Sequence, residues 1–253
     1  MAASSKAVQQ ALANVLAAMK RHGFEITQNL EVVVDEGLPF MGYTSRHWQK
    51  QLIVVSGFAV KSNMLEGLLT HELSHVYRGQ TKHPSHNDQI IAHLARSFIS
   101  MHNLNEDYQR EILHQVINHV QDLYADDIAT QVLTAEESHL LRLEQLGDFF
   151  LGWIRDEPVK TGMVRKDQWV NASIMLNNCF AISNMQRHAI EDRDEKAKMR
   201  NETFMRRINP VAAESFSYFN AFMVNLKERV SDAEFQREME EYLSRFLAVV
   251  EVM

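Results

Sequence analysis

Apolar residues recur every three to four positions along most of the chain, a spacing that predicts amphipathic α-helices. The early part differs, because two short stretches rich in valine and isoleucine predict β-strands, with a turn around Pro39 and Gly42 between them. The strands are expected within 24–34 and at 51–56, and the helices at 5–22, 63–78, 88–103, 106–133, 135–154, 166–188, 190–206, 210–229 and 231–250. The pattern therefore predicts an α+β fold that is mainly α-helical, with a small N-terminal sheet.

The expected helix at 63–78 carries the most informative motif of the chain. Asn63 followed by Glu66 resembles a capping box, and Gly79 stands where a helix would end. Between them lies the sequence His71-Glu-Leu-Ser-His75. Residues four apart lie on the same face of a helix, so two imidazoles at this spacing can bind one metal ion.

Glu72, between the two histidines, has a chemical use beside a metal ion. A bound metal makes a coordinated water acidic near neutral pH, and a neighbouring carboxylate can take its proton. A charged glutamate among apolar neighbours also needs a partner. The alternative is an ordinary amphipathic helix whose histidines are satisfied core residues, but the motif favours a zinc-dependent hydrolase. Two histidines and a carboxylate suit zinc better than magnesium or calcium.

A second motif, Asp122-Leu-Tyr-Ala-Asp126, makes the chain similar to the gluzincin clan of zinc metallopeptidases. Those enzymes pair His-Glu-x-x-His with a downstream helix that carries Glu-x-x-Ala-Asp. The resemblance implies that His71 and His75 are zinc ligands, that Glu72 is the general base and that Asp122 is the third ligand. It also implies that Asp126 supports a zinc histidine and that the fold is zincin-like, with the active-site helix beside the sheet. The chain departs from the pattern in having aspartate, one methylene shorter, at the third-ligand position.

Two other residues compete for the role of third ligand. His119 stands one turn before Asp122 on the same polar stripe of the expected helix, so it could bind the metal with Asp122 behind it. His83 is two positions late for the third histidine of the metzincin clan. Candidates for donating to a developing oxyanion are Tyr77, His83, His86 and Tyr124.

The expected strand at 51–56 leads into the motif helix. Zinc peptidases use such a strand to hold an extended peptide by backbone pairing. A plain core strand is the other interpretation of the same apolar run.

Composition restricts the class of protein. The 253 residues carry a net charge of −7, which does not favour a nucleic-acid partner. No apolar run approaches the roughly 20 residues that span a bilayer, so no membrane partner is expected. Cys179 is the only cysteine, and the first residues lack the apolar core of a secretory signal, so a cytoplasmic protein is expected.

The expected organisation is a zincin-like, metal-binding catalytic region at 1–133 and a helical region at 134–253 that packs on it and walls the cleft. The alternative is that the two regions form one continuous domain. The predicted function is that of a zinc-dependent metallopeptidase acting on a peptide or protein substrate. The alternative is a non-catalytic helical interaction protein with a structural or inactive metal site. Side-chain preference, endo- or exopeptidase action and oligomeric state stay open.

Overall fold

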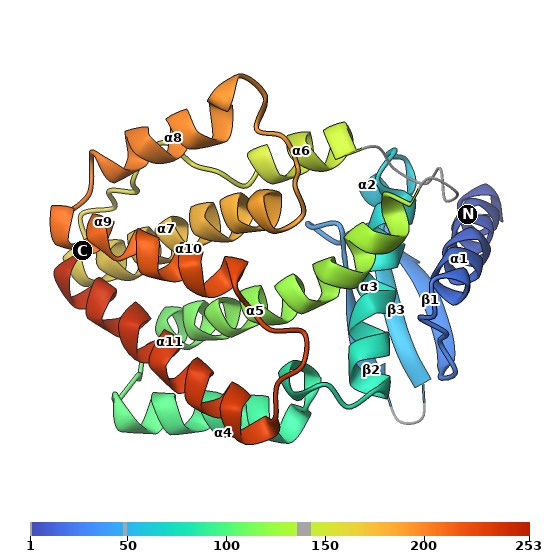
Figure 1. The fold of residues 1–253 in the computed structure, drawn as a ribbon, viewed down its shortest axis with the longest axis horizontal. Coiled ribbons are helices and arrows are strands. Elements are labelled where there is room, and N and C mark those ends of the chain that lie inside the picture. Colours follow the sequence, from blue (N-terminus) through green and yellow to red (C-terminus); the bar gives the residue numbers. More distant parts are fainter. Residues whose placement is uncertain (1, 48–49, 136–142) are drawn as a thin grey trace. The chain divides into compact units, whose positions relative to one another are not determined.

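A computed structural model describes residues 2–47, 50–135 and 143–253. It is mainly helical with one three-stranded sheet among the described residues, so the predicted α+β class is confirmed (Figure 1). Two compact units make up the chain: Met1–His86 with Tyr124–Arg142, and Asn87–Leu123 with Leu143–Met253. The division at residues 133 and 134 into a catalytic and a helical region stays a prediction.

The sheet of the first unit contains β1 (Asn29–Asp35), β2 (Gly42–His47) and β3 (Lys50–Ser56). Their order is β1-β3-β2, with β1 parallel and β2 antiparallel to β3. The expected strand at 51–56 is thus the central strand, paired on both sides. It is a core strand, and the interpretation that it holds a peptide by backbone pairing is wrong.

Strand β2 lies at the edge of the sheet and was not predicted, since the sequence indicated only a turn around Pro39 and Gly42. Its first residue, Gly42, passes so close to β3 that an added Cβ would lie 2.6 Å from the Val54 carbonyl oxygen. Hydrogen bonding to β3, with Gly42 opposite Val55 and His47 opposite Lys50, makes this polar segment a strand.

Helices α1 (Ala2–Arg21) and α3 (Leu65–Gln80) pack together and contribute to one core with the sheet. A short helix, α2 (Gly57–Val60), joins β3 to α3. The core contains residues from α1, β3, α3 and the end of α5, including Val15, Met19, Ile53, Val55, Leu69, Leu73, Ile128 and Val132. Alternate residues of β3 and every fourth residue of α3 enter this core, which is the periodicity of each element.

The predicted ends of α3 are wrong. Met64, not Asn63, is the N-cap, and it makes no side-chain capping bond. The helix continues through Gly79 to Gln80, and Thr81 is its C-cap. The preceding turn explains the difference, because the Ser62 hydroxyl accepts a hydrogen bond from the Met64 amide at 3.1 Å.

The second unit is helical throughout its described elements. Its helices are α4 (Asp88–Met101), the first part of α5 (Asp107–Leu133), α6 (Leu143–Leu151), α7 (Val164–Arg187), α8 (Lys196–Met205), α9 (Pro210–Glu214), α10 (Phe216–Val224) and α11 (Asp232–Val252). Helix α7 is mostly buried and contacts α6, α8, α10 and α11. No helix in the described ranges is both long and apolar enough to cross a membrane.

Candidate metal centre

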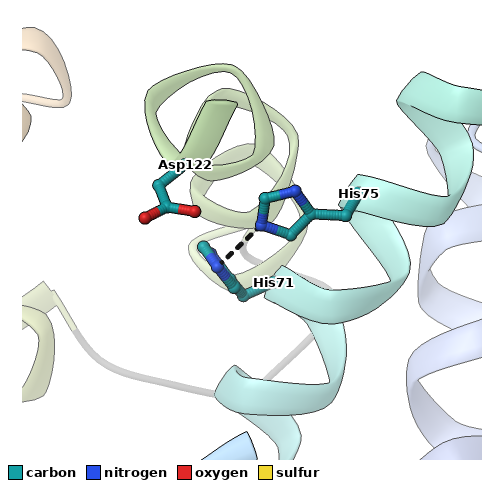
Figure 2. A group of neighbouring side chains, drawn as sticks. All are labelled: His71, His75 and Asp122. Atoms are coloured by element: carbon teal, nitrogen blue, oxygen red, sulfur yellow. Dashed lines mark hydrogen bonds between the residues drawn. The ribbon is translucent and has the colours of Figure 1, made fainter. Parts of the chain in front are cut away.

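His71 and His75 lie on α3, on the side away from the core. Leu69 and Leu73 of the same helix are fully buried, whereas both histidines are partly exposed. The two Nε2 atoms are 3.0 Å apart (Figure 2). Two nitrogens bound to one tetrahedral zinc, each at about 2.0–2.1 Å, would stand roughly 3.3 Å apart. The spacing along α3 therefore brings the two nitrogens to ligand distance.

Asp126 on α5 binds the outer nitrogen of His71. Its Oδ1 is 2.7 Å from His71 Nδ1, and its side chain is 13% exposed. Because a carboxylate only accepts, this contact places the proton on Nδ1 and leaves the Nε2 lone pair for a metal. This is the supporting position that the gluzincin resemblance implies for Asp126.

Asp122 lies one helical turn before Asp126 on α5 and is directed toward the two imidazoles (Figure 2). Ligand atoms of His71, His75 and Asp122 all lie within 4.8 Å of one another. Among the described residues, no other group of histidine, cysteine or acidic side chains comes together in this way. The structure thus brings together the three residues that the resemblance implies as ligands.

His75 is held from its other side by the segment after α3. Its Nδ1 is 2.7 Å from Nε2 of His86, which belongs to a 3₁₀ turn, η1 (Pro84–His86). Burial, followed by the charges of His75 and other nearby cationic groups, lowers the pKa of His86 well below its ordinary value. His86 is therefore neutral near pH 7. The sequence offered it only as an oxyanion donor and missed its contact with His75.

Glu72 is 5% exposed, and its carboxylate accepts a hydrogen bond from Thr44 on β2. The Thr44 hydroxyl is 2.7 Å from Glu72 Oε2 and 3.3 Å from the Glu72 carbonyl oxygen. The partner that the buried carboxylate requires is thus partly supplied by the edge strand. The sequence analysis could not identify Thr44 as the partner of Glu72, because it did not predict β2.

His119 is not a member of the group, although it lies on α5 one turn before Asp122. It is buried in the second unit, where its ring stacks on Phe180 with centroids 5.1 Å apart. Burial lowers the pKa of His119 to about 4, outweighing Asp122 and a hydrogen bond with Asn177, which raise it.

The remaining oxyanion candidates pack within the first unit. Tyr77 contacts Phe24 edge-on, with centroids 5.2 Å apart. Tyr124 is fully buried, and its ring lies 4.4 Å from that of His83. His83 bonds Ser85 through Nδ1 at 2.7 Å. These contacts assign none of the three residues as the oxyanion donor.

The chemistry of this donor set fits zinc. A cation between the two imidazole nitrogens, which face each other at 3.0 Å, would bind both lone pairs, and a carboxylate lies within reach of both. Nitrogen and carboxylate donors in a set of three are typical of a catalytic zinc site. The described residues therefore include a group that could hold a metal ion.

The chain belongs to a family of unknown function, DUF5781, whose model matches residues 7–247. No curated protein and no solved structure matches it.

Proposed function

We propose that this member of the DUF5781 family is a zinc-dependent metallopeptidase in which His71, His75 and Asp122 hold the ion. The observation that carries the proposal is the His71–His75–Asp122 group with Glu72 on the same helix. Zinc bound there would polarise the scissile carbonyl and acidify the attacking water. The likeness to the gluzincin clan supports the same roles.

Glu72 is the proposed general base. It takes a proton from the attacking water and returns it to the departing amine. Thr44 holds one carboxylate oxygen, Oε2, at 2.7 Å, and the other oxygen, Oε1, is the one we assign to the proton transfer. The hydrogen bond to Thr44 restricts the rotation of the carboxylate and so favours one geometry for the transfer.

Strand β2 is the edge of the sheet beside this base. An extended peptide could pair with its outer edge and so bring a scissile bond alongside α3. In this scheme β2, and not β3, performs the substrate-holding role, because both edges of β3 are already paired.

The decisive experiment measures bound zinc and peptide hydrolysis in the wild type, in Glu72→Gln and in Glu66→Gln. Glu66 lies on the same helix and accepts a hydrogen bond from Asn14 at 2.8 Å, which glutamine can preserve, so it is a matched control. Equal zinc in all three proteins with hydrolysis lost only in Glu72→Gln supports the peptidase. Zinc without turnover of a peptide library in any of them would favour the non-catalytic alternative, and failure to bind zinc would reject both.

A further inference from the structure

A chain of four hydrogen-bonded side chains leads from His75 away from the proposed metal. His75 Nδ1 is 2.7 Å from His86 Nε2, and His86 Nδ1 is 2.8 Å from the Ser85 hydroxyl. The same hydroxyl is 2.7 Å from His83 Nδ1. Ser85 is fully buried, so these contacts do not compete freely with solvent.

The chain has two possible directions. A neutral imidazole carries one N–H, and a hydroxyl has one proton, so each member that donates on one side accepts on the other. In the first direction His75 donates from Nδ1 and has its lone pair on Nε2, facing His71. In the second direction His75 accepts at Nδ1, and its proton is on Nε2, where it would block a metal.

One main-chain group selects the first direction. The amide of Ser85 donates to His83 Nδ1 at 3.3 Å, so this nitrogen is an acceptor and carries no proton. The Ser85 hydroxyl must then donate to it. Its oxygen accepts from His86 Nδ1, and His86 Nε2, now the free lone pair of a neutral ring, accepts from His75 Nδ1.

We propose that His83, Ser85 and His86 are positioning residues that fix His75 in the tautomer protonated on Nδ1, so that Nε2 carries no proton and can bind the metal. Asp126 does the same for His71 with a single charged contact. The inference rests on the proposed function in one respect, that His75 is a metal ligand. It adds that a peptide amide in the turn after α3, rather than a carboxylate, determines the protonation of this ligand.

The tautomer can be measured directly in metal-free protein. With ¹⁵N-labelled histidine at about pH 8, two-bond ¹H–¹⁵N correlations distinguish protonated Nδ1 from protonated Nε2. We expect His75 to be protonated on Nδ1 in the wild type. In Ser85→Ala the chain is broken, so we expect a substantial population protonated on Nε2 and zinc affinity about 10- to 100-fold lower. His93→Gln, an exposed histidine on α4, should change neither quantity.

A pair of substitutions at His83 distinguishes the effect of hydrogen-bond direction from the effect of side-chain packing. His83→Asn keeps an acceptor near the position of Nδ1, and His83→Leu has similar size without one. Asn should preserve the His75 tautomer and zinc affinity, while Leu should behave like Ser85→Ala. This pair of variants, together with the wild-type spectrum, tests whether the chain sets the tautomer of His75 even if Ser85→Ala does not fold.

Wild-type His75 protonated mainly on Nε2 would overturn the proposal, as would equal tautomers and zinc affinities in His83→Asn and His83→Leu. Neither measurement requires peptide hydrolysis. A protein with the expected tautomers and affinities but no turnover would therefore contradict the peptidase and leave this inference standing.

Discussion

The hydroxyl of Thr44, on β2, donates a hydrogen bond to the carboxylate of Glu72, on α3, with 2.7 Å between Oγ1 and Oε2. The two residues are 28 positions apart in the chain. The contact joins an edge strand of the sheet to the proposed base. A substitution or displacement in β2 should therefore change the position of the Glu72 carboxylate directly.

Replacing Thr44 by valine keeps the shape of the side chain and removes the donor. A hydrogen bond to a charged group contributes about 1.5–3 kcal/mol, so we expect kcat/KM for peptide hydrolysis to fall about 10- to 100-fold with bound zinc unchanged. Thr44→Ser should recover most of the activity, and Ser45→Ala on the same strand serves as control. Full activity in Thr44→Val would show that the base needs no such partner.

Asp122 and Asp126 should differ in their effect on metal binding. Removing a ligand deletes a bond to the ion, whereas removing a supporting group typically costs about 10- to 100-fold in affinity. We expect zinc affinity, measured by chelator competition, to fall within that range in Asp126→Asn and well beyond it in Asp122→Ala. A larger loss in His119→Ala than in Asp122→Ala would reassign the third ligand to His119.

The local spacing of the motif explains which parts of the site could be predicted. His71 and His75 come together because both are on one helix, and α-helical geometry alone fixes their separation. His86 meets His75 only because η1 folds back after α3, and periodicity carries no information about such a turn. His119 shares a polar stripe with Asp122 in sequence, yet its ring is covered by Phe180, a residue 61 positions later.

The sheet likewise contains one strand that its own residues predict and one that they do not. Strand β3 is recognisable because it is a continuous run of β-branched and apolar residues that is buried on both faces. Strand β2 contains glycine, serine, arginine and histidine, and it is extended because β3 supplies its hydrogen bonds. An edge strand of this composition has no signal of its own, and the contact between Thr44 and Glu72 was missed with it.

Acid should destabilise the fold through His119. Its pKa is about 4 in the folded protein and about 6.5 in the unfolded chain, so the unfolded chain binds the proton first as pH falls. The free energy of unfolding should therefore decrease from pH 6.5 to pH 4, by about 3 kcal/mol in total from this residue, and level off below. Urea unfolding across this range should show a smaller loss in His119→Gln than in wild type.

The control for this experiment is His114→Gln, an exposed histidine on the same helix. An identical pH dependence in His119→Gln and His114→Gln would contradict the assignment of the effect to His119.

Arg78 should be important for stability. It is 3% exposed, its Nε donates to the Tyr124 carbonyl oxygen at 2.9 Å, and its guanidinium lies 5.7 Å from the centre of the Tyr124 ring. Arg78→Ala leaves a buried carbonyl without this donor and removes packing, so we expect a loss of about 2–4 kcal/mol in urea unfolding. The exposed Arg96→Ala should lose less than about 0.5 kcal/mol. A similar loss in both would exclude a special role for Arg78.

Gly42 should tolerate no side chain. A Cβ there would stand 2.6 Å from the Val54 carbonyl oxygen, so β2 must move away from β3. Gly42→Ala should therefore lower the free energy of unfolding by about 1–3 kcal/mol. It should also make amide hydrogen exchange in β2 faster. Gly79→Ala, at a helical glycine with open space around it, should be neutral or stabilising. Unchanged exchange in Gly42→Ala would mean that the strand absorbs the methyl group without moving.

Helix α5 belongs to both compact units, since the chain enters the second unit after His86 and returns to the first at Tyr124. A nascent chain that has reached His86 thus has α3 and the sheet but not Ile128 and Val132 of the same core. Packing of the N-terminal unit must wait until the end of α5 has left the ribosome. The first segment of the second unit, Asn87–Leu123, is therefore synthesised before the N-terminal unit has all of its core residues.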